Sequence, residues 1–520
     1  MAAKKFMAII ICIFIIAGTA AAIASCADSG SPGSQNSDGE KNGNNNGNDG
    51  NESDASASEA IDYSKYDRED TPDNIPQDLK FSGQTFNLLS REESKDGMLF
   101  GIEMGVEEEN GDIVNDTVYR RNKSVEDRFD ITINVIKIPG IWGAEVNFNN
   151  TIRNSVKSGD NAYDLIAGYA YFITPLAPEG NFLNWIKVPH IDSSAPWWSA
   201  DLAEKMTLDG KLYFISGDLS LTFTSQMQCI LFNQRMQRDY GLENLYETVL
   251  DGKWTFDELY NICKDIYVDV NGDGRRDKED IYGLATNHGG NICEQLFVSQ
   301  NQPMTIKGDD GYPYLVFNSP KTAAITENMI SLFFENTGVF TLTETPSAAN
   351  TINNMFENGQ ALFLTTGVDA AQRFRNMADD FGVLPYPKFD ESQEKYMGLT
   401  QDAYSLFCIP AICEDFEFAG AVTEALAAES YRKLTPAYYE TALKIKYSRD
   451  DTTSQMLDII RSGVQFDFAF VNSNGMENII HIFRELTSRK SSDFVSLYEK
   501  NESVYQANLD RIIEAYKELK

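Results

Sequence analysis

The sequence of 520 residues contains only three histidines, His190, His288 and His481, and no two of them have the His-x-x-x-His spacing of a zinc site. Its 7 cysteines are too few for a disulfide scaffold. None of them forms a Cys-x-x-Cys pair, which excludes a zinc knuckle and a thioredoxin-type redox motif. The sequence therefore offers no cysteine- or histidine-based chemistry.

The local sequence motifs of common enzyme classes are also missing. The chain has no phosphate-binding P-loop, no Gly-x-Gly-x-x-Gly turn after a strand, no Gly-x-Ser-x-Gly elbow and no His-Glu-x-x-His helix. A glycosidase that uses a pair of carboxylates stays open as an alternative, because such a pair need not be close in sequence. We therefore expect a protein that is not an enzyme and needs no catalytic cofactor.

Positive charge is in short supply. Lys and Arg number 44 against 78 Asp and Glu, so the formal net charge is −34. Such a chain repels phosphates, which argues against nucleic acid and against a polybasic membrane patch. Apolar residues make up 42% and aromatic residues 12%, as in globular proteins. The length exceeds that of one ordinary core and predicts two lobes.

The first residues resemble an export signal. Lys4 and Lys5 precede an apolar run over 6–16, and small residues lead to Ile23-Ala24-Ser25-Cys26. A plain transmembrane anchor is the alternative, since residues 6–24 are just long enough to span a bilayer. The last four residues resemble the bacterial lipobox. That resemblance implies cleavage of a signal peptide over 1–25, lipidation of Cys26, and a protein held at the outer, extracellular face of the cytoplasmic membrane.

Residues 26–78 follow the expected lipid attachment. They are rich in Gly, Asn, Ser and Asp and contain almost no large apolar residue before Ile61. A segment that buries so little apolar surface cannot offset the entropy lost on folding. We expect an acidic, disordered tether here.

From about residue 79, strand and helix patterns alternate. Short apolar strands are predicted at 84–89, 131–135 and 163–167, with amphipathic helices between them. The alternation resumes at 230–232, and Thr255 is expected to cap a helix through a capping box with Glu258. Strands at 361–364 and 382–384 precede a mainly helical C-terminal part. The fold class is therefore α/β, with mostly parallel sheets flanked by helices, and ligands should bind at the carboxyl ends of the strands.

One loop has the spacing of a calcium site. Oxygen-bearing side chains occupy positions 1, 3, 5, 9 and 12 of the segment 269–280, and Gly274 stands where an EF-hand loop turns sharply. Asp replaces the usual Glu at the last position. A solvated turn rich in Asp and Asn is the alternative. The expected ligands of a structural Ca²⁺ are Asp269, Asn271, Asp273, the Arg275 carbonyl, Asp277 and Asp280.

The order of several short segments behind the lipobox resembles the extracellular solute-binding proteins, family 1. These are the lipoprotein receptors of ABC importers, distantly similar to maltose-binding protein. The resemblance covers about residues 80–520. It is carried by Asn115-Asp116-Thr117-Val118-Tyr119, Val125-Glu126-Asp127-Arg128-Phe129, Tyr163-Asp164-Leu165-Ile166, Pro196-Trp197-Trp198, Gly210-Lys211-Leu212-Tyr213-Phe214, Leu231-Phe232-Asn233, Trp254-Thr255-Phe256-Asp257-Glu258-Leu259, Asn271-Gly272-Asp273-Gly274 before Asp280-Ile281-Tyr282-Gly283, and Phe381-Gly382-Val383-Leu384-Pro385-Tyr386-Pro387-Lys388.

The resemblance implies a two-lobed periplasmic-binding-protein-like fold of type II that closes on a solute and then docks on a permease. By analogy the hinge crossings fall near 218–226, 365–368 and 400–405. Lobe one would then comprise 79–220 and 367–402, and lobe two 221–366 and 403–520. The implied partners are a small solute, a membrane permease and the membrane itself through the lipid, with the protein acting as a monomer.

Contact with the solute is expected at strand ends and at the hinge. Aromatic faces stack on sugar rings, while carboxylates and amides bond hydroxyl groups. Ordinary packing is the alternative for each tyrosine, and Trp197 and Trp198 are expected to be structural. The nominated ligand-binding residues are Tyr169, Tyr171, Asp218, Gln226, Asp369 and Tyr404.

The sequence therefore favours a lipid-anchored subunit of an ABC importer that captures a carbohydrate and does no chemistry. Two alternatives stay open. One is an extracellular glycoside-active enzyme, and the other is a surface protein that captures polysaccharide without a transporter.

Overall fold

The computed structural model describes residues 61–92, 99–439 and 452–519, and its two main sheets each combine parallel and antiparallel strand pairs. The first sheet has four strands in the order β12-β3-β1-β2. Strand β1 pairs in parallel with both β2 and β3, whereas β12 runs antiparallel to β3. The strands are β1 (Thr85–Arg91), β2 (Thr132–Ile138), β3 (Leu165–Tyr169) and β12 (Ser405–Cys408).

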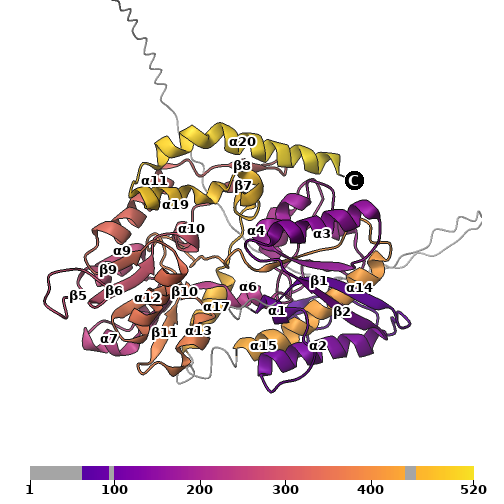
Figure 1. Ribbon diagram of the computed structural model, residues 1–520, viewed down its shortest axis with the longest axis horizontal. Coiled ribbons are helices and arrows are strands. Elements are labelled where there is room, and N and C mark those ends of the chain that lie inside the picture. The colour runs from indigo at the N-terminus through magenta and orange to yellow at the C-terminus, as the bar shows by residue number, and fades with distance from the viewer. Residues whose placement is uncertain (1–60, 93–98, 440–451, 520) are drawn as a thin grey trace, which may run out of the picture. The chain divides into compact units, whose positions relative to one another are not determined.

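The second sheet has six strands, ordered β11-β4-β10-β6-β5, with β9 also paired to β6 (Figure 1). Strands β6, β9 and β10 are mutually parallel, while β4 is antiparallel to its neighbours β10 and β11. A separate hairpin joins β7 (Thr305–Lys307) and β8 (Pro313–Leu315). The strands are β4 (Gln228–Asn233), β5 (Tyr267–Val268), β6 (Ile281–Asn287), β9 (Val339–Leu342), β10 (Ala361–Gly367) and β11 (Phe381–Leu384).

Helices connect and cover these strands, which confirms the expected α/β class. Those before β4 are α1 (Phe100–Glu103), α2 (Ile113–Phe129), α3 (Glu145–Ser158), α4 (Ala170–Ile173), α5 (Ala200–Met206) and α6 (Leu221–Ser225). Those up to β11 are α7 (Gln234–Asp239), α8 (Leu245–Leu250), α9 (Phe256–Lys264), α10 (Gly290–Ser299), α11 (Pro320–Ile330), α12 (Pro346–Glu357) and α13 (Ala370–Arg373). The C-terminal ones are α14 (Phe416–Glu429), α15 (Thr435–Tyr438), α17 (Thr452–Ser462), α18 (Phe468–Val471), α19 (Ile482–Arg489) and α20 (Phe494–Glu518).

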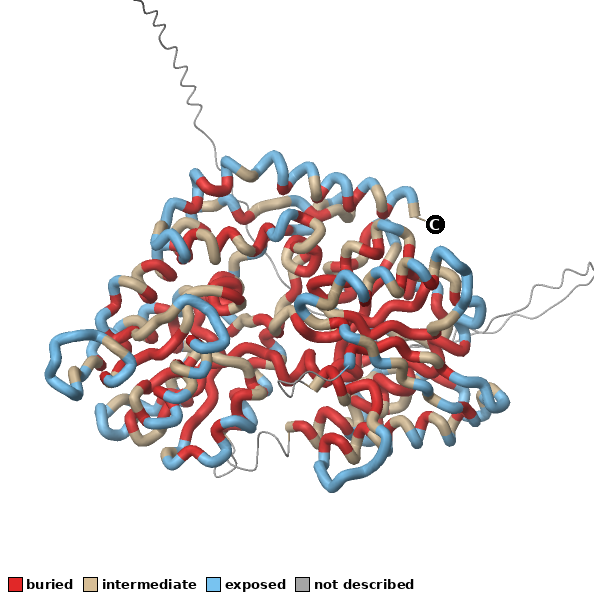
Figure 2. Tube along the Cα trace, viewed as in Figure 1, coloured by how far each residue is buried: buried red, intermediate tan, exposed pale blue. Residues whose placement is uncertain are grey.

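Local sequence signals explain where several helices begin and end. The Thr255 hydroxyl accepts the Glu258 N–H and caps α9, as the sequence predicts. Helix α2 is capped by Asp112, which accepts the first backbone N–H groups of the helix. Gly159 ends α3 with φ 68°, a left-handed conformation that glycine adopts without strain. The central strands of both sheets form the buried core (Figure 2), while residues on outer helix faces, in loops and on the edge strand β2 are exposed.

The chain between the sheets differs from the expected lobe boundaries. Strand β11 lies in 367–402 yet pairs with β4 of the second sheet, and β12 lies in 403–520 yet pairs with β3 of the first sheet. Residues 365–368 end β10 and lead to α13 without leaving the second sheet's side. Strands β11 and β12 therefore lie in the opposite lobes to those expected, whereas α17 and α19 of the segment 403–520 pack against elements of the second lobe, as expected. The error arose because the polar stretch after β11 carries no signal of the sheet that the next strand joins.

The expected crossings near 218–226 and 400–405 do connect the two sheets. They run side by side: Gln228 N donates to Leu399 O at 2.9 Å, Gln401 N donates to Gln226 O at 2.9 Å, and the Thr400 hydroxyl donates to Phe223 O at 2.8 Å. A pair of hydrogen-bonded crossings is a connection about which two lobes can rotate. Helix α20 also contacts both lobes, because Phe494 packs against Phe317 and Tyr516 packs against Tyr213.

The end of the expected tether is folded. Residues 61–78 carry short 3₁₀ turns at Tyr63–Lys65 and Arg68–Asp70. Asp73 pairs with Arg128 at 2.7 Å and with Arg432 at 3.0 Å. Ile75 is buried. The described body therefore begins before residue 79, because a few anchoring side chains hold a segment whose average composition is that of a linker. Residues 1–60, with Cys26 and the expected signal peptide, lie outside the described residues.

A buried carboxylate fixes both crossings to the first sheet. The side chain of Glu103 is 0% exposed and lies 3.8 Å from the equally buried guanidinium of Arg91. Its Oε2 accepts the backbone N–H of Thr222 at 2.9 Å and the Thr222 hydroxyl at 2.8 Å. Its Oε1 accepts the Ser405 hydroxyl. Arg91 in turn donates to Ala403 O at 2.8 Å. One ion pair thus holds residues of both crossings.

Replacing Glu103 by Leu should lower the free energy of unfolding by about 3–5 kcal/mol, because the variant leaves the Arg91 charge buried without its partner. Urea denaturation monitored by circular dichroism measures the loss. Glu109→Leu removes an exposed carboxylate that pairs with Arg120 and serves as the control; it should cost less than about 1 kcal/mol. Equal losses in the two variants would contradict the role given to Glu103.

Candidate functional site

An aromatic stack stands at the carboxyl ends of strands β2 and β3. Trp142 follows β2, and its ring lies 5.9 Å from Tyr171 at an interplanar angle of 22°. Tyr171 continues the stack to His481 at 6.0 Å and 17°. Tyr171 is 4% exposed, whereas Trp142 is 64% exposed. The exposed indole therefore offers a flat aromatic surface at the strand ends, which is where ligands of such sheets bind.

Charged side chains from both lobes lie beside this stack. The Tyr169 hydroxyl donates to Asp402 Oδ1 at 3.3 Å. Arg484 donates through Nε to Glu294 Oε1 at 2.6 Å and through Nη2 to Asn291 Oδ1 at 3.4 Å. Burial lowers the pKa of Arg484, but the carboxylates of Glu294, Asp402 and Glu344 together outweigh burial and raise it overall. Burial also raises the pKa of Asp402, an effect that Arg484 partly offsets. These groups form a polar floor next to the aromatic wall.

Helix α10 and the strand before it bring buried polar atoms without a protein partner. They are Oδ1 of Asn287, at the end of β6, Oε2 of Glu294 and Nε2 of Gln295. Buried polar groups are nearly always hydrogen-bonded, because each unpaired one costs about 1–3 kcal/mol. Two acceptors and one donor on β6 and α10 are groups of the kind that pair with a ligand that has several hydroxyl groups.

The nominated residues fall into separate places. Tyr169 and Tyr171 belong to the cluster just described. Gln226 and Asp369 lie together at the hinge, where Gln226 Nε2 donates to Asp369 Oδ2 at 3.3 Å. Burial raises the pKa of Asp369, and the Gln226 bond works against this rise. Tyr404 is 4% exposed and packs edge-on against Phe223 at 5.8 Å.

Asp218 holds a different position from the one expected. Both of its oxygens accept bonds from Arg461, at 2.7 and 2.9 Å, and Oδ1 also accepts the Thr435 hydroxyl at 2.9 Å. Its side chain is 2% exposed. The structure therefore gives Asp218 the role of joining the first crossing to α17 and α15, and solute contact is not available to it in this arrangement.

Sequence reasoning missed much of the cluster. Asp402, Glu294, Arg484 and His481 come from segments far apart in the sequence, and no local pattern joins them. Trp142 did carry a signal, because it follows a predicted strand within the turn Gly140-Ile141-Trp142-Gly143. Trp197 and Trp198 are buried, as expected.

The space beside Tyr171 and Asp402 is small. A hollow lined by Tyr171, Asp402, Tyr404 and neighbouring residues has a volume of about 20 Å³. That is room for about one water molecule and not for a monosaccharide. A solute of that size must meet the cluster over the exposed face of Trp142 or after the lobes have moved apart about the two crossings.

The loop expected to bind Ca²⁺ is a compact series of turns. Asp269 accepts the N–H of Gly272 at 2.7 Å and of Gly274 at 2.9 Å, and the two glycines have φ 70° and 71°. Asp280 is buried and accepts the Val270 N–H at 3.2 Å and the Tyr267 hydroxyl at 3.2 Å. Within residues 61–92, 99–439 and 452–519, no group of three or more His, Cys, Asp or Glu is arranged to hold a metal ion.

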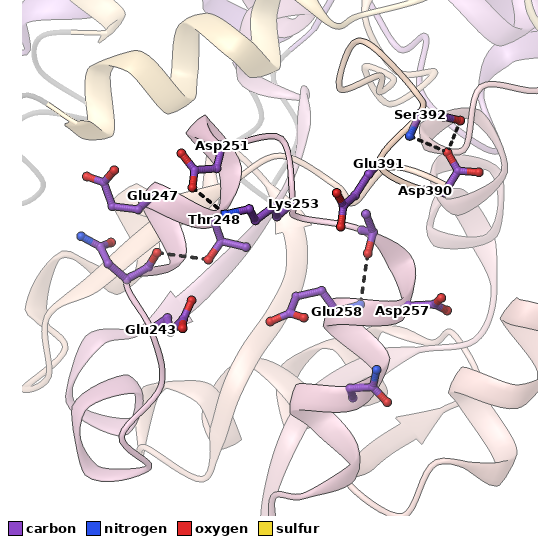
Figure 3. A pocket seen from close by; sticks show the side chains of 13 residues that line it. Glu243, Glu247, Thr248, Asp251, Lys253, Asp257, Glu258, Asp390, Glu391 and Ser392 are labelled. Atoms are coloured by element: carbon purple, nitrogen blue, oxygen red, sulfur yellow. Dashed lines mark hydrogen bonds and ion pairs between the residues drawn. The ribbon is translucent and has the colours of Figure 1, made fainter.

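A hollow of about 640 Å³ lies on the second lobe, among helices α8 and α9 and the loop after β11 (Figure 3). Its only cation is Lys253, which pairs with Asp251 at 2.9 Å. No aromatic side chain lines it. The hollow therefore lacks the stacking surface that distinguishes the Trp142 cluster. The carboxylates that line it are Glu243, Glu247, Asp251, Asp257, Glu258, Asp390 and Glu391.

Two further properties concern the body as a whole. Cys229, Cys263, Cys293, Cys408 and Cys413 are free thiols in the described part of the chain, and all are buried. Among the same residues, no helix combines the length and the hydropathy needed to cross a bilayer.

No family model and no curated protein matches the sequence. Solved structures do match the fold. The galacto-N-biose-/lacto-N-biose I-binding protein of an ABC transporter from Bifidobacterium longum has a TM-score of 0.55 at 12% identity, covering 83% of this chain and 98% of its own. UspC of M. tuberculosis scores 0.54 at 12% identity over 82% and 100%. A cyclo/maltodextrin-binding protein complexed with maltotetraose scores 0.54 at 12% identity over 84% and 98%. The chain therefore has the two-lobed periplasmic-binding-protein-like fold that its sequence resembles.

The buried carboxyl group in this site should make stability depend on pH. Burial raises the pKa of Glu294 to about 7 from its ordinary value of 4.5, although Arg484 lowers it in part. Between these two values the folded state holds more protons than the unfolded state, so stability falls as pH rises. Glu294→Gln should remove that slope: the melting temperature of wild type relative to the variant should drop from pH 4.5 to pH 7.

Glu485→Gln, which removes an exposed carboxylate of α19 that pairs with Arg489, is the control and should follow the wild-type curve. Differential scanning fluorimetry between pH 4.5 and pH 7 measures the melting temperatures of wild type and both variants. A Glu294→Gln curve parallel to wild type would show that Glu294 does not titrate there.

Proposed function

We propose that this chain is the lipid-anchored, extracellular solute-binding subunit of an ABC importer, and that it captures a carbohydrate between two lobes for delivery to a permease. The observation that carries the proposal is the exposed Trp142 face beside unpartnered buried polar atoms. Sugar rings present an apolar face to an aromatic ring and hydroxyl groups around their edge. The aromatic ring and the polar atoms at the ends of the strands therefore supply a partner for the apolar face of the sugar and for its hydroxyl groups.

Individual roles follow from the geometry. The exposed ring of Trp142 stacks on a sugar residue, and Tyr171 supports the indole from its other side. Asn287 Oδ1 and Glu294 Oε2 accept bonds from sugar hydroxyls, and Gln295 Nε2 donates to one. Arg484 and Tyr169 hold the carboxylates of Glu294 and Asp402 in place. Closure about the hinge then brings groups of both lobes onto one solute, and that shared contact stabilises the closed state.

Membrane attachment and delivery rest on the sequence. Cys26 in its lipobox would carry the lipid, and residues after it would act as a tether. Two of the solved neighbours named above are described as a cyclo/maltodextrin-binding protein and as the galacto-N-biose-/lacto-N-biose I-binding protein of an ABC transporter, which supports import as the purpose of capture. Energy for transport must come from partner subunits.

Hydrolysis of a glycoside is the second candidate function. The observation in its favour is that two carboxyl groups, the buried Glu294 and the partly buried Asp402, interact with each other and both have a raised pKa. A glycosidase uses such a pair, one as acid and one as base or nucleophile. Binding is favoured because Arg484 and Tyr169 already engage these carboxylates.

A saccharide screen separates the two functions. Mono- and oligosaccharides are incubated with the full chain, binding is read as a rise in melting temperature, and the sugar is then analysed by chromatography. A ligand at 100 times its dissociation constant adds about 2.7 kcal/mol of stability. Recovery of an unchanged sugar supports capture, and its conversion to products would assign hydrolysis instead.

Trp142→Ala should weaken binding of the saccharide found in that screen by about tenfold, because stacking on an aromatic ring contributes about 0.5–1.5 kcal/mol beyond buried area. Isothermal titration calorimetry measures the change. The control is Tyr314→Ala, which removes an aromatic side chain that is 50% exposed on β8. An unaltered affinity in Trp142→Ala would remove Trp142 from the site.

We further propose that the loop 269–280 binds a structural Ca²⁺ through Asp269, Asn271, Asp273, the Arg275 carbonyl, Asp277 and Asp280. The spacing of these donors supports the proposal. Calcium should raise the melting temperature of the wild-type chain and a chelator should reverse the rise, while Asp273→Ala should abolish both effects. Asp309→Ala, outside the loop, is the control and should retain them. If calcium leaves the melting temperature of the wild-type chain unchanged, the loop is a solvated turn.

A further inference from the structure

A second hollow, of about 390 Å³, lies next to the saccharide cluster and has a different chemistry. Its walls come from both lobes: α5, the end of α10, strand β7, the second crossing at 397–399, and residues 465–470. Apolar side chains form most of its surface. They are Phe297, Val298, Pro303, Met304, Ile306, Met397, Leu399, Phe466 and Phe470.

Two charged side chains in these walls, Asp467 and Lys307, are already bonded to the protein, and Glu204 and Lys205 also line the hollow. Asp467 accepts the N–H groups of Met304 and Thr305 at 3.0 and 2.7 Å, and its other oxygen accepts the Thr305 hydroxyl at 2.9 Å. Lys307 donates to backbone carbonyl oxygens of Glu204 and Thr207 at 2.6 and 2.9 Å. An occupant would therefore meet apolar surface here, in contrast to the unpartnered polar atoms around α10.

The two hollows share a wall. Leu399, Gln465, Phe466 and Phe470 line both the 390 Å³ hollow and the small hollow beside Tyr171 and Asp402. A molecule that reaches Tyr171 and Asp402 when the lobes have moved apart therefore lies next to the apolar hollow. Met304 and Met397 contribute flexible side chains, and such side chains adapt to occupants of irregular shape.

We infer that this hollow receives an apolar substituent of the captured solute, so that the ligand class is a glycoside bearing an aryl or acyl group. The inference rests on the proposed carbohydrate function and refines it. Size agrees with the assignment, because cavities of about 150 Å³ already bind benzene and small-molecule pockets span about 300–1,000 Å³. Polar groups of the cluster hold the sugar, and the apolar hollow takes its substituent.

The pocket itself is tested first with a neutral fluorescent probe, N-phenyl-1-naphthylamine, and the full chain. Saturable fluorescence enhancement is expected for wild type. Ile306→Asp places a charge at a side chain that is 51% exposed in the wall, and it should weaken probe binding at least fivefold. Ile306→Trp, which fills space without adding charge, should do the same. Ile186→Asp, at a side chain that is 57% exposed and outside the hollow, should bind as wild type does.

The solute is tested next with matched methyl and phenyl glycosides of the saccharides in the screen. Phenyl glycosides should bind at least tenfold more tightly than their methyl partners in wild type and Ile186→Asp, and with equal affinity in Ile306→Asp. Lack of probe binding, or equal affinity of the two glycosides in wild type, would overturn the inference while leaving carbohydrate capture intact. Failure of every saccharide and glycoside to bind would overturn the proposed function, and this inference with it.

Discussion

The buried ion pair of Glu103 and Arg91 is the constraint on which the arrangement of the two lobes depends. Two charges removed from water are tolerated only when hydrogen bonds satisfy them, and here the partners are residues of the two crossings, Thr222, Ala403 and Ser405. The crossings are thereby fixed to the end of β1, and rotation of the lobes must take place beyond these anchored points. Polar bonds to Glu103 and Arg91 thus fix the crossings at Thr222, Ala403 and Ser405. Between these anchored residues and the second sheet, main-chain bonds such as Gln401 N to Gln226 O join the two crossings.

The same geometry explains why the candidate site is chemically mixed. Strand β3 ends in Tyr169 and Trp142 follows β2, whereas β6 leads to the polar residues of α10. The second crossing supplies Asp402. An aromatic wall on one lobe and hydrogen-bonding groups on the other match the two kinds of surface on a sugar. A mostly acidic chain is compatible with this function, because a neutral solute is not repelled by the net charge of −34.

Much of the fold could be predicted from sequence, because hydrophobic alternation and capping residues act locally. Strands β1, β2, β3, β4, β10 and β11 and the Thr255 cap of α9 lie where those patterns place them. Strand order could not be predicted in the same way, so β11 and β12 were given to the wrong lobes. The residues of the candidate site also divide into those that a local sequence pattern indicates and those that only the fold brings together. Tyr169 and Tyr171 follow a predicted strand and could be named, whereas Arg484 reaches Glu294 across 190 positions. Asp218 was nominated as a solute contact, but in the structure it is bonded to Arg461. An acidic residue at a hinge can equally be a structural anchor, and the sequence does not separate these roles.

Acrylamide quenching of tryptophan fluorescence tests the central claim most directly. Of the 5 tryptophans in the chain, Trp185, Trp197, Trp198 and Trp254 are buried and Trp142 is 64% exposed, so collisional quenching reports mainly on Trp142. A saccharide that stacks on this ring should shield it and reduce the slope of the quenching plot as the site fills. Calorimetric binding of a saccharide with an unchanged quenching slope would contradict capture at the Trp142 face.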